Sequence, residues 1–197
     1  MKEKLLRLVF LSIFFTTASL THATPEKLVI DNKHSYVLWS LEHHGFSTQT
    51  GKWFVDGTIV ADKDKPENSR VDAVINIKDM VTGIPDLDKH LEGKEFFDAA
   101  QFPKASFVSN KIEVTGKDTG KIHGTLTIRG ISKPVVLDAK LNKIAESPIT
   151  HKMTAGFSAS TEIKRSDFGI NTYLPTLGDN VKIQIAIEAY KPTENQA

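Results

Sequence analysis

Six histidines follow Thr24, and imidazole is the side chain most often used for acid–base catalysis and for zinc binding. None of the six has the spacing of a zinc site. His43 and His44 are adjacent, and neighbouring side chains of a strand point to opposite faces, so these two cannot readily share one metal ion. The sequence therefore predicts no metal site.

Nucleophile motifs are also missing from the chain. Ser35 stands beside His34, but adjacent residues of a strand diverge, which is the wrong relation for a nucleophile and its base. The chain contains no Cys, no Gly-x-Ser-x-Gly elbow and no glycine-rich phosphate loop. Asp167-Phe168-Gly169 matches one kinase motif without the others, and we interpret it as a turn at a strand end. We predict no catalytic residues and a non-enzymatic protein.

The N-terminus has the pattern of a secretory signal peptide. A basic start is followed by the apolar residues 8–15, too few to span a bilayer, and Ala23 provides a small residue for cleavage before Thr24. An uncleaved anchor is the alternative. We expect a signal peptide over 1–23, one domain over 24–191 and a flexible tail over 192–197, in a periplasmic or secreted protein.

The charge of the mature chain excludes two classes of partner. Without the charged residues of the first 23 positions, 22 basic and 23 acidic residues remain of the 25 and 24 in the whole chain. This balance gives no electrostatic attraction to nucleic acid or to an anionic membrane. Because the chain has no Cys, disulfides cannot stabilise it outside the cell, and stability must come from apolar burial.

Apolar and polar residues alternate with a period of two along most of the mature chain, which indicates strands with one solvated face. In several of these segments the apolar residues hold the odd positions. Turn signals such as DKDKPENS and TGKDTG separate the segments. The eight expected strands cover residues 36–43, 53–60, 71–78, 105–114, 122–129, 135–142, 153–161 and 181–189.

Regular alternation favours antiparallel pairing, since parallel strands buried on both faces have continuous apolar runs. Eight such strands can close into a barrel, which removes exposed edges and leaves an interior able to hold one small ligand. A two-sheet sandwich has the same periodicity and stays open as an alternative. We therefore expect an all-β fold, an eight-stranded antiparallel barrel.

Residues 86–103 break the alternation. Leu87 and Leu91 are four apart, which predicts a short helix, and an irregular apolar segment follows. Phe96, Phe97 and Phe102 suggest a plug or lid at one mouth of the barrel. The alternative is a helix that only caps the core.

Four sequence blocks extend together across nearly the whole mature chain, namely residues 30–53, 88–109, 124–141 and 163–170. In their order and spacing these blocks resemble the YceI-like family of polyisoprenoid-binding proteins. Trp39 and Trp53 stand where the family pattern has Phe, and the pair His43-His44 doubles a single His. The larger indole side chains are expected to narrow the lumen.

The resemblance implies a lipocalin-like barrel in the periplasm that binds, and carries or sequesters, an isoprenoid chain such as that of a polyprenyl phosphate or a quinone. It implies no cofactor beyond this ligand. Transient membrane contact is compatible with the role, and a dimer stays open as the oligomeric state. The alternatives are an enzyme that acts on such a lipid through His43 and a nearby carboxylate, and a stress-responsive interaction module with a solid barrel.

The expected ligand contacts fall into two groups. The tail should lie against inward apolar residues and the lid, namely Val37, Trp39, Leu41, Trp53, Ile75, Phe96, Phe97, Phe107, Leu126, Phe157, Phe168 and Ile185. The head should meet His34, Ser35, His43 and Arg165, whose side chains can donate to carbonyl or phosphate oxygen. The alternatives are ordinary core packing for the first group and, for the second, a strand-end cap by His34 and Ser35 with Arg165 paired to Asp167.

Overall fold

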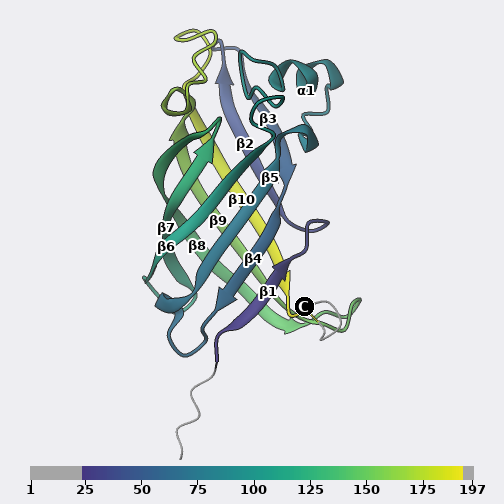
Figure 1. Cartoon of the computed structure of the whole chain (residues 1–197), viewed down its shortest axis with the longest axis vertical. Helices are drawn as coiled ribbons and strands as arrows, with labels where there is room; N and C mark the ends of the chain where they lie inside the picture. Colours follow the sequence, from purple (N-terminus) through teal and green to yellow (C-terminus); the bar gives the residue numbers. More distant parts are fainter. Residues whose placement is uncertain (1–23, 193–197) are drawn as a thin grey trace, which may run out of the picture.

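The computed structural model describes residues 24–192. The expected signal peptide, and all of the expected tail except Pro192, lie outside this range. The described residues form one antiparallel sheet of ten strand segments and one α-helix (Figure 1). The strands are β1 (Glu26–Ile30), β2 (Tyr36–His43), β3 (Ser47–Phe54), β4 (Asp56–Ala61), β5 (Arg70–Asn76), β6 (Lys104–Val114), β7 (Thr119–Ile128), β8 (Ile131–Glu146), β9 (Met153–Lys164) and β10 (Asn180–Tyr190).

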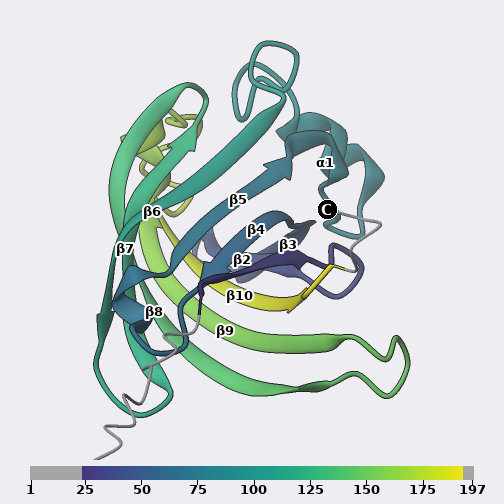
Figure 2. The ribbon, with the colours of Figure 1, turned by 60° about the horizontal axis from the view of Figure 1, so that its bottom comes forward.

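The sheet closes on itself. Its strand order is β1-β4-β5-β6-β7-β8-β9-β10, and β1 pairs with β10, through Val29 with Tyr190 and Ile30 with Ala189, to complete a ring of eight (Figure 2). The hairpin β2–β3 continues from β10 beyond the end of β1. The prediction of an eight-stranded antiparallel barrel is confirmed, and the two-sheet sandwich is excluded.

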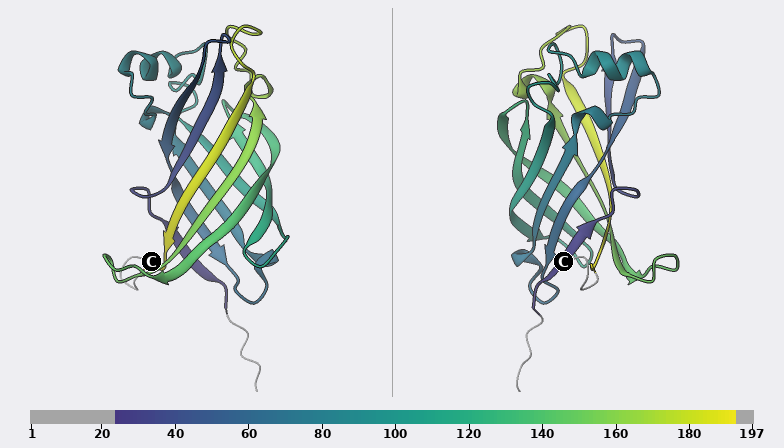
Figure 3. Two further views of the ribbon diagram at one scale, coloured as in Figure 1. Left: turned by 180° about the vertical axis from the view of Figure 1, so that it is seen from behind. Right: turned by 45° about the vertical axis from the view of Figure 1, so that its right-hand side comes forward.

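At two places in the barrel wall, two short strands follow one another where one long strand was expected. The period-two alternation of the sequence did not reveal this. β1 and β2 lie in turn beside the lower and upper parts of β10, and β3 runs into β4 across Val55 (Figure 3). The expected strand 53–60 therefore spans the break between β3 and β4. Residues 47–52 are mostly polar because this part of β3 forms the rim of the barrel, and the expected strand set omitted it together with β1.

Ser35 completes the hydrogen bonding of β10 at the point where β1 ends and β2 begins. Its side chain is fully buried, and its Oγ donates to the carbonyl oxygen of Glu188 at 3.1 Å and accepts from the N–H of Glu188 at 3.0 Å. The hydroxyl thus takes the place of a neighbouring strand's backbone at this point of β10. The alternative interpretation of Ser35, as a residue that caps a strand end, agrees with this geometry.

We predict that Ser35→Ala lowers the free energy of unfolding by about 1–3 kcal/mol, because the N–H of Glu188 loses its partner inside the protein, while the carbonyl oxygen of Glu188 keeps only the bond from the Asp31 N–H at 2.8 Å. Denaturant unfolding of the purified protein measures the change. Ser160→Ala, at an exposed position of β9, is the control. Its free energy of unfolding should stay within about 0.5 kcal/mol of the wild-type value. Equal stabilities for both variants would contradict this role of Ser35.

A β-bulge in β6 changes which residues face the interior. The register with β7 shifts between Ser109 and Lys111. Phe107 faces the interior before the bulge, whereas Ile112 and Val114 do so after it, so the inward row moves from odd to even positions. A second shift lies in β8 between Leu141 and Lys143. These bulges bend the strands where the barrel wall must curve.

Residues 77–103, the lid segment, cover the upper mouth beside β2 and β3 (Figure 1). The segment contains a 3-10 helix (Ile77–Asp79) and α1 (Pro85–Leu91), which confirms the expected short helix. Its two ends meet because the N–H of Ile77 donates to the carbonyl oxygen of Pro103 at 2.9 Å. Val81 and Lys52 exchange two backbone hydrogen bonds of 2.9 and 3.0 Å, so the lid segment is fixed to the free edge of β3.

Candidate functional site

A large apolar cavity fills the middle of the barrel. Its volume is about 830 Å³, in the upper part of the ~300–1,000 Å³ range of small-molecule sites. The inward rows of the strands form its wall, and the lid segment contributes Leu87, Leu91 and Phe97. At the opposite end the lining reaches the β6–β7 turn at Lys117. The barrel is therefore hollow along its length, and the solid-barrel alternative does not apply.

The burial of the inward residues agrees with a lumen that side chains do not fill. Leu126, Ile183 and Ile185 belong to inward rows of a closed barrel, yet each is only half-buried. In a filled core, apolar residues at these positions would be fully buried, as Ile77 is at the start of the lid segment. Their remaining exposed surface faces the cavity and is available to an apolar ligand.

Every predicted ligand-contact residue except His34 and Ser35 lines this cavity. The residues found there are Val37, Trp39, Leu41, His43, Trp53, Ile75, Phe96, Phe97, Phe107, Leu126, Phe157, Arg165, Phe168 and Ile185. Their contact with a ligand stays a prediction. Among the lining residues that the sequence reasoning missed, Ile112 follows the β6 bulge, while His44, Gln49 and His90 stand at the upper mouth.

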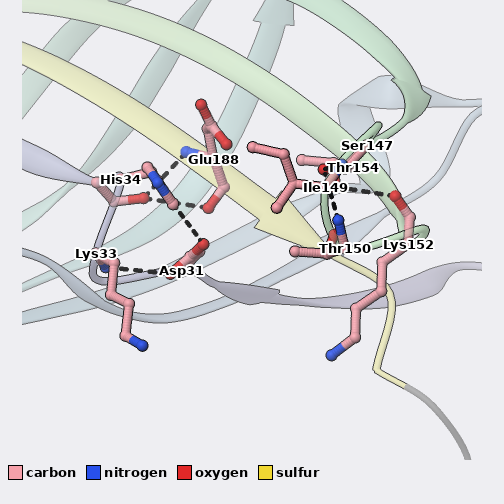
Figure 4. A network of polar contacts seen from close by, with 10 residues as sticks. Asp31, Lys33, His34, Ser147, Ile149, Thr150, Lys152, Thr154 and Glu188 are labelled. Atoms are coloured by element: carbon pink, nitrogen blue, oxygen red, sulfur yellow. Dashed lines mark hydrogen bonds and ion pairs between the residues drawn. The ribbon is translucent and has the colours of Figure 1, made fainter.

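His34 lies outside the cavity lining. It is exposed, and its Nδ1 lies 2.8 Å from Oδ2 of Asp31 (Figure 4). This hydrogen bond raises the pKa of His34 above its ordinary value. Partial burial opposes ionisation of Asp31, but the hydrogen bonds from His34 and from the Lys33 N–H outweigh it and lower the pKa of Asp31. With the buried Ser35, this pair organises the β1–β2 connection on the outside of the barrel.

Arg165 lines the cavity, but its guanidinium is committed to the protein. It donates to the carbonyl oxygens of Gly178 at 2.7 Å, Thr172 at 2.9 Å, Ile170 at 3.0 Å and Leu177 at 3.1 Å. The side chain is 5% exposed, and burial lowers its pKa. Arg165 therefore holds the β9–β10 connection, and its N–H groups are not free to form a bidentate contact with a head group.

The alternative interpretation, in which Arg165 pairs with Asp167, does not hold among the described residues. The carboxylate that interacts electrostatically with Arg165 is Asp179. Asp179 also accepts hydrogen bonds from the N–H of Ser166 at 2.9 Å and from its Oγ at 2.8 Å. Burial opposes ionisation of Asp179, but these two hydrogen bonds lower its pKa overall. The interpretation of Asp167-Phe168-Gly169 as a strand-end turn agrees with the structure, because a 3-10 helix (Arg165–Phe168) follows β9 and ends at Gly169, which has a left-handed φ of 73°.

Two glycines allow large aromatic side chains to lie flat against the barrel wall. Trp39 on β2 pairs with Gly51 on β3, and a Cβ atom at Gly51 would stand 2.5 Å from the Trp39 ring. Phe107 on β6 lies in the same way over Gly124 on β7, where a Cβ atom would stand 2.4 Å from its ring. Because Gly51 and Gly124 have no side chain, both rings can stay out of the centre of the lumen. This holds even though Trp39 is larger than the Phe that the family pattern has at this position.

We predict that Gly51→Ala forces the indole of Trp39 toward the lumen and weakens binding of a long apolar ligand by about tenfold, comparable to the 1–3 kcal/mol cost of an overpacked core. Ligand titration measures the change. Gly156→Ala on β9 is the control, because its Cβ atom would meet nothing closer than 4.0 Å. Unchanged affinity in Gly51→Ala would contradict the packing argument.

No group of three or more His, Asp or Glu side chains within residues 24–192 is placed to hold a metal ion. His43 and His44 contact each other edge-on, with ring centroids 4.6 Å apart. No helix among the described residues is long and apolar enough to cross a bilayer.

Comparisons with known proteins agree with this architecture. The model of a family described as the YceI-like domain matches residues 28–189. Protein YceI of Salmonella agona strain SL483 is 36% identical over 189 residues, which cover 95% of this chain and 97% of that protein. The crystal structure of the Campylobacter jejuni YCEI protein is 29% identical, has a TM-score of 0.65, and the match covers 98% of this chain and 100% of that one.

A polyisoprenoid binding domain from Saccharophagus degradans, implicated in plant cell wall breakdown, has the same type of barrel. Its TM-score is 0.66 over 86% of this chain and 100% of that one. The sequence identity is 12%, so this likeness concerns the fold.

Proposed function

Because the chain belongs to the YceI-like family, we propose that its barrel binds the apolar chain of an isoprenoid lipid and carries it through the periplasm. The observation that carries the proposal is the continuous apolar cavity of about 830 Å³ inside a closed barrel. The likeness of the fold to a polyisoprenoid binding domain supports the choice of ligand class. The expected signal peptide over residues 1–23 supports the choice of compartment.

The energetics of such a site suit transport better than storage. At about 0.8 kcal/mol per buried methylene, a chain of about 40 carbons would gain ~30 kcal/mol relative to water, above the ceiling of about 18–21 kcal/mol for non-covalent affinity. A lipid taken from a bilayer already has its tail out of water, so the net gain on transfer is close to zero. The barrel then shields the tail during the aqueous passage and can release it again.

Uptake from a membrane is supported by apolar side chains on the rim of the upper mouth. Phe46, in the β2–β3 turn, is 90% exposed. Ile84 and Tyr173 are both more than half exposed and also line the cavity. Apolar surface is thus continuous from the lumen to the outside, which gives a lipid tail a path that avoids water.

Binding without catalysis accounts best for the chemistry of the lining. An enzyme that used His43 would need a carboxylate or another group to orient the imidazole. Among the described residues, no carboxylate forms a hydrogen bond or ion pair with His43, His44 or His90, the histidines of the lining. The lining instead offers apolar contacts, which are non-directional and suit a flexible chain.

Intrinsic fluorescence tests the proposal, because the only two tryptophans of the chain, Trp39 and Trp53, both line the cavity. The protein is titrated with prenols of increasing chain length, delivered from cyclodextrin. We expect a saturable emission change at a stoichiometry near one, with affinity that rises with chain length until the lumen is full. The absence of a saturable change for every chain length would overturn the proposal.

A further inference from the structure

The histidines of the described chain fall into two groups. Three lie beside a carboxylate and outside the cavity lining: His34 with Asp31 at 2.8 Å, His123 with Glu113 at 3.5 Å, and His151 with Glu146 at 3.4 Å. The other three, His43, His44 and His90, line the cavity. No residue within 24–192 forms a hydrogen bond or ion pair with their side chains. The imidazoles at the cavity are therefore available to a ligand.

The three available imidazoles stand at one mouth. His43 ends β2 and His44 begins the turn to β3, while His90 lies on α1, and the views in Figures 1 and 3 place this turn and α1 at the same end of the barrel. His43 also forms a β-bridge with Leu177. The ring of His90 lies 5.0 Å from that of Phe96, which packs in the same apolar cluster as Leu177.

The cationic residues of the lining are placed differently. Lys117 follows β6 in the turn to β7, and Lys140 on β8 pairs with Thr119, so both lie at the lower end. Arg165 stands near the upper mouth, but backbone carbonyls occupy four of its five N–H groups. The described lining of the upper mouth therefore offers imidazoles and no free ammonium or guanidinium group.

We propose that the upper mouth binds the head group of the ligand, and that this head group is uncharged and carries oxygen, such as the carbonyl of a quinone or the hydroxyl of a prenol. This inference rests on the proposed function. A neutral imidazole has one donor and one acceptor nitrogen, which match a carbonyl or hydroxyl oxygen. A phosphate monoester would instead favour fixed cations, which the lining of this mouth lacks. The tail then extends down the lumen toward the β6–β7 turn.

The test compares three probes that share isoprenoid chemistry: a long-chain ubiquinone, a polyprenyl phosphate, and squalene, which has no head group. The variant combines His43→Ala, His44→Ala and His90→Ala. We expect its affinity for the quinone to fall about 10- to 100-fold, as for the loss of one or two hydrogen bonds. Its affinity for squalene should stay within about twofold, since the apolar wall is unchanged.

Two further variants make the result specific. His34→Ala with His151→Ala is the control, because it removes imidazoles that lie outside the lining and should leave quinone binding unchanged. Lys117→Ala with Lys140→Ala changes the opposite end of the lumen, and its loss of quinone affinity should be smaller than that of the histidine variant. Thermal unfolding of each variant verifies the fold.

Three outcomes would overturn the inference. They are equal losses for squalene and quinone in the triple variant, a loss for polyprenyl phosphate as large as that for the quinone, and quinone binding that depends on the lysines and not on the histidines. Failure of the wild type to bind any of the three probes would instead refute the proposed function itself.

Discussion

Replacing Ala159 by Trp should abolish binding of a long isoprenoid chain. Ala159 lies on β9 and lines the cavity, and its partners across the sheet, Ala139 on β8 and Ile185 on β10, line it as well. An indole at this point projects into the lumen and displaces several methylenes of the ligand. At about 0.8 kcal/mol each, the loss of four contacts lowers the affinity about 100-fold or more.

Ser160→Trp is the matched control for this variant. Ser160 is the next residue of β9, faces outward and is exposed. The Ser160→Trp variant should bind ligand with the affinity of the wild type, because its indole lies in solvent outside the barrel. Tight binding by Ala159→Trp, or equal losses in both variants, would show that the ligand does not occupy the lumen.

Replacing Arg165 by Met should destabilise the protein by about 3 kcal/mol or more, because four backbone carbonyls lose a charged donor inside the protein. Met retains an unbranched apolar side chain, so the effect reports mainly the lost hydrogen bonds. For a domain of this size the melting temperature should fall by roughly 6–12 °C. Thermal unfolding followed by circular dichroism measures it.

Arg70→Met provides the comparison. Arg70 is exposed, and its guanidinium donates to the carbonyl oxygens of Ser69 at 2.7 Å and Glu67 at 3.3 Å. Because water can replace these bonds, this variant should stay within about 0.5 kcal/mol of the wild type. If Arg165→Met and Arg70→Met have the same melting temperature, the β9–β10 connection does not depend on Arg165.

The barrel could be predicted because alternation with a period of two is a local property of each strand. The breaks in the wall could not, since they depend on pairing between distant residues. Ser35 separates β1 from β2 because its side chain forms hydrogen bonds with the backbone of Glu188, 153 residues away. The bulge at Ser109–Lys111 likewise follows from the register with β7 and not from the sequence of β6 alone.

The tail contacts and the head contacts differ in how far the sequence predicts them. Inward residues such as Leu126 and Ile185 follow from the strand period. Arg165 was selected for its side-chain type, but four carbonyls of the β9–β10 connection occupy it. His90 was missed because it lies on α1, although its spacing of three from Leu87 places it near the apolar face of that helix.

Extraction of the protein purified from its native compartment, followed by mass spectrometry, tests the central claim most directly. A hollow apolar barrel of about 830 Å³ should retain its lipid through purification. The expected result is one isoprenoid lipid per protein chain from the wild type and none from Ala159→Trp. Recovery of no stoichiometric apolar molecule from the wild type, or of equal amounts from both proteins, would contradict the claim that the lumen is the binding site.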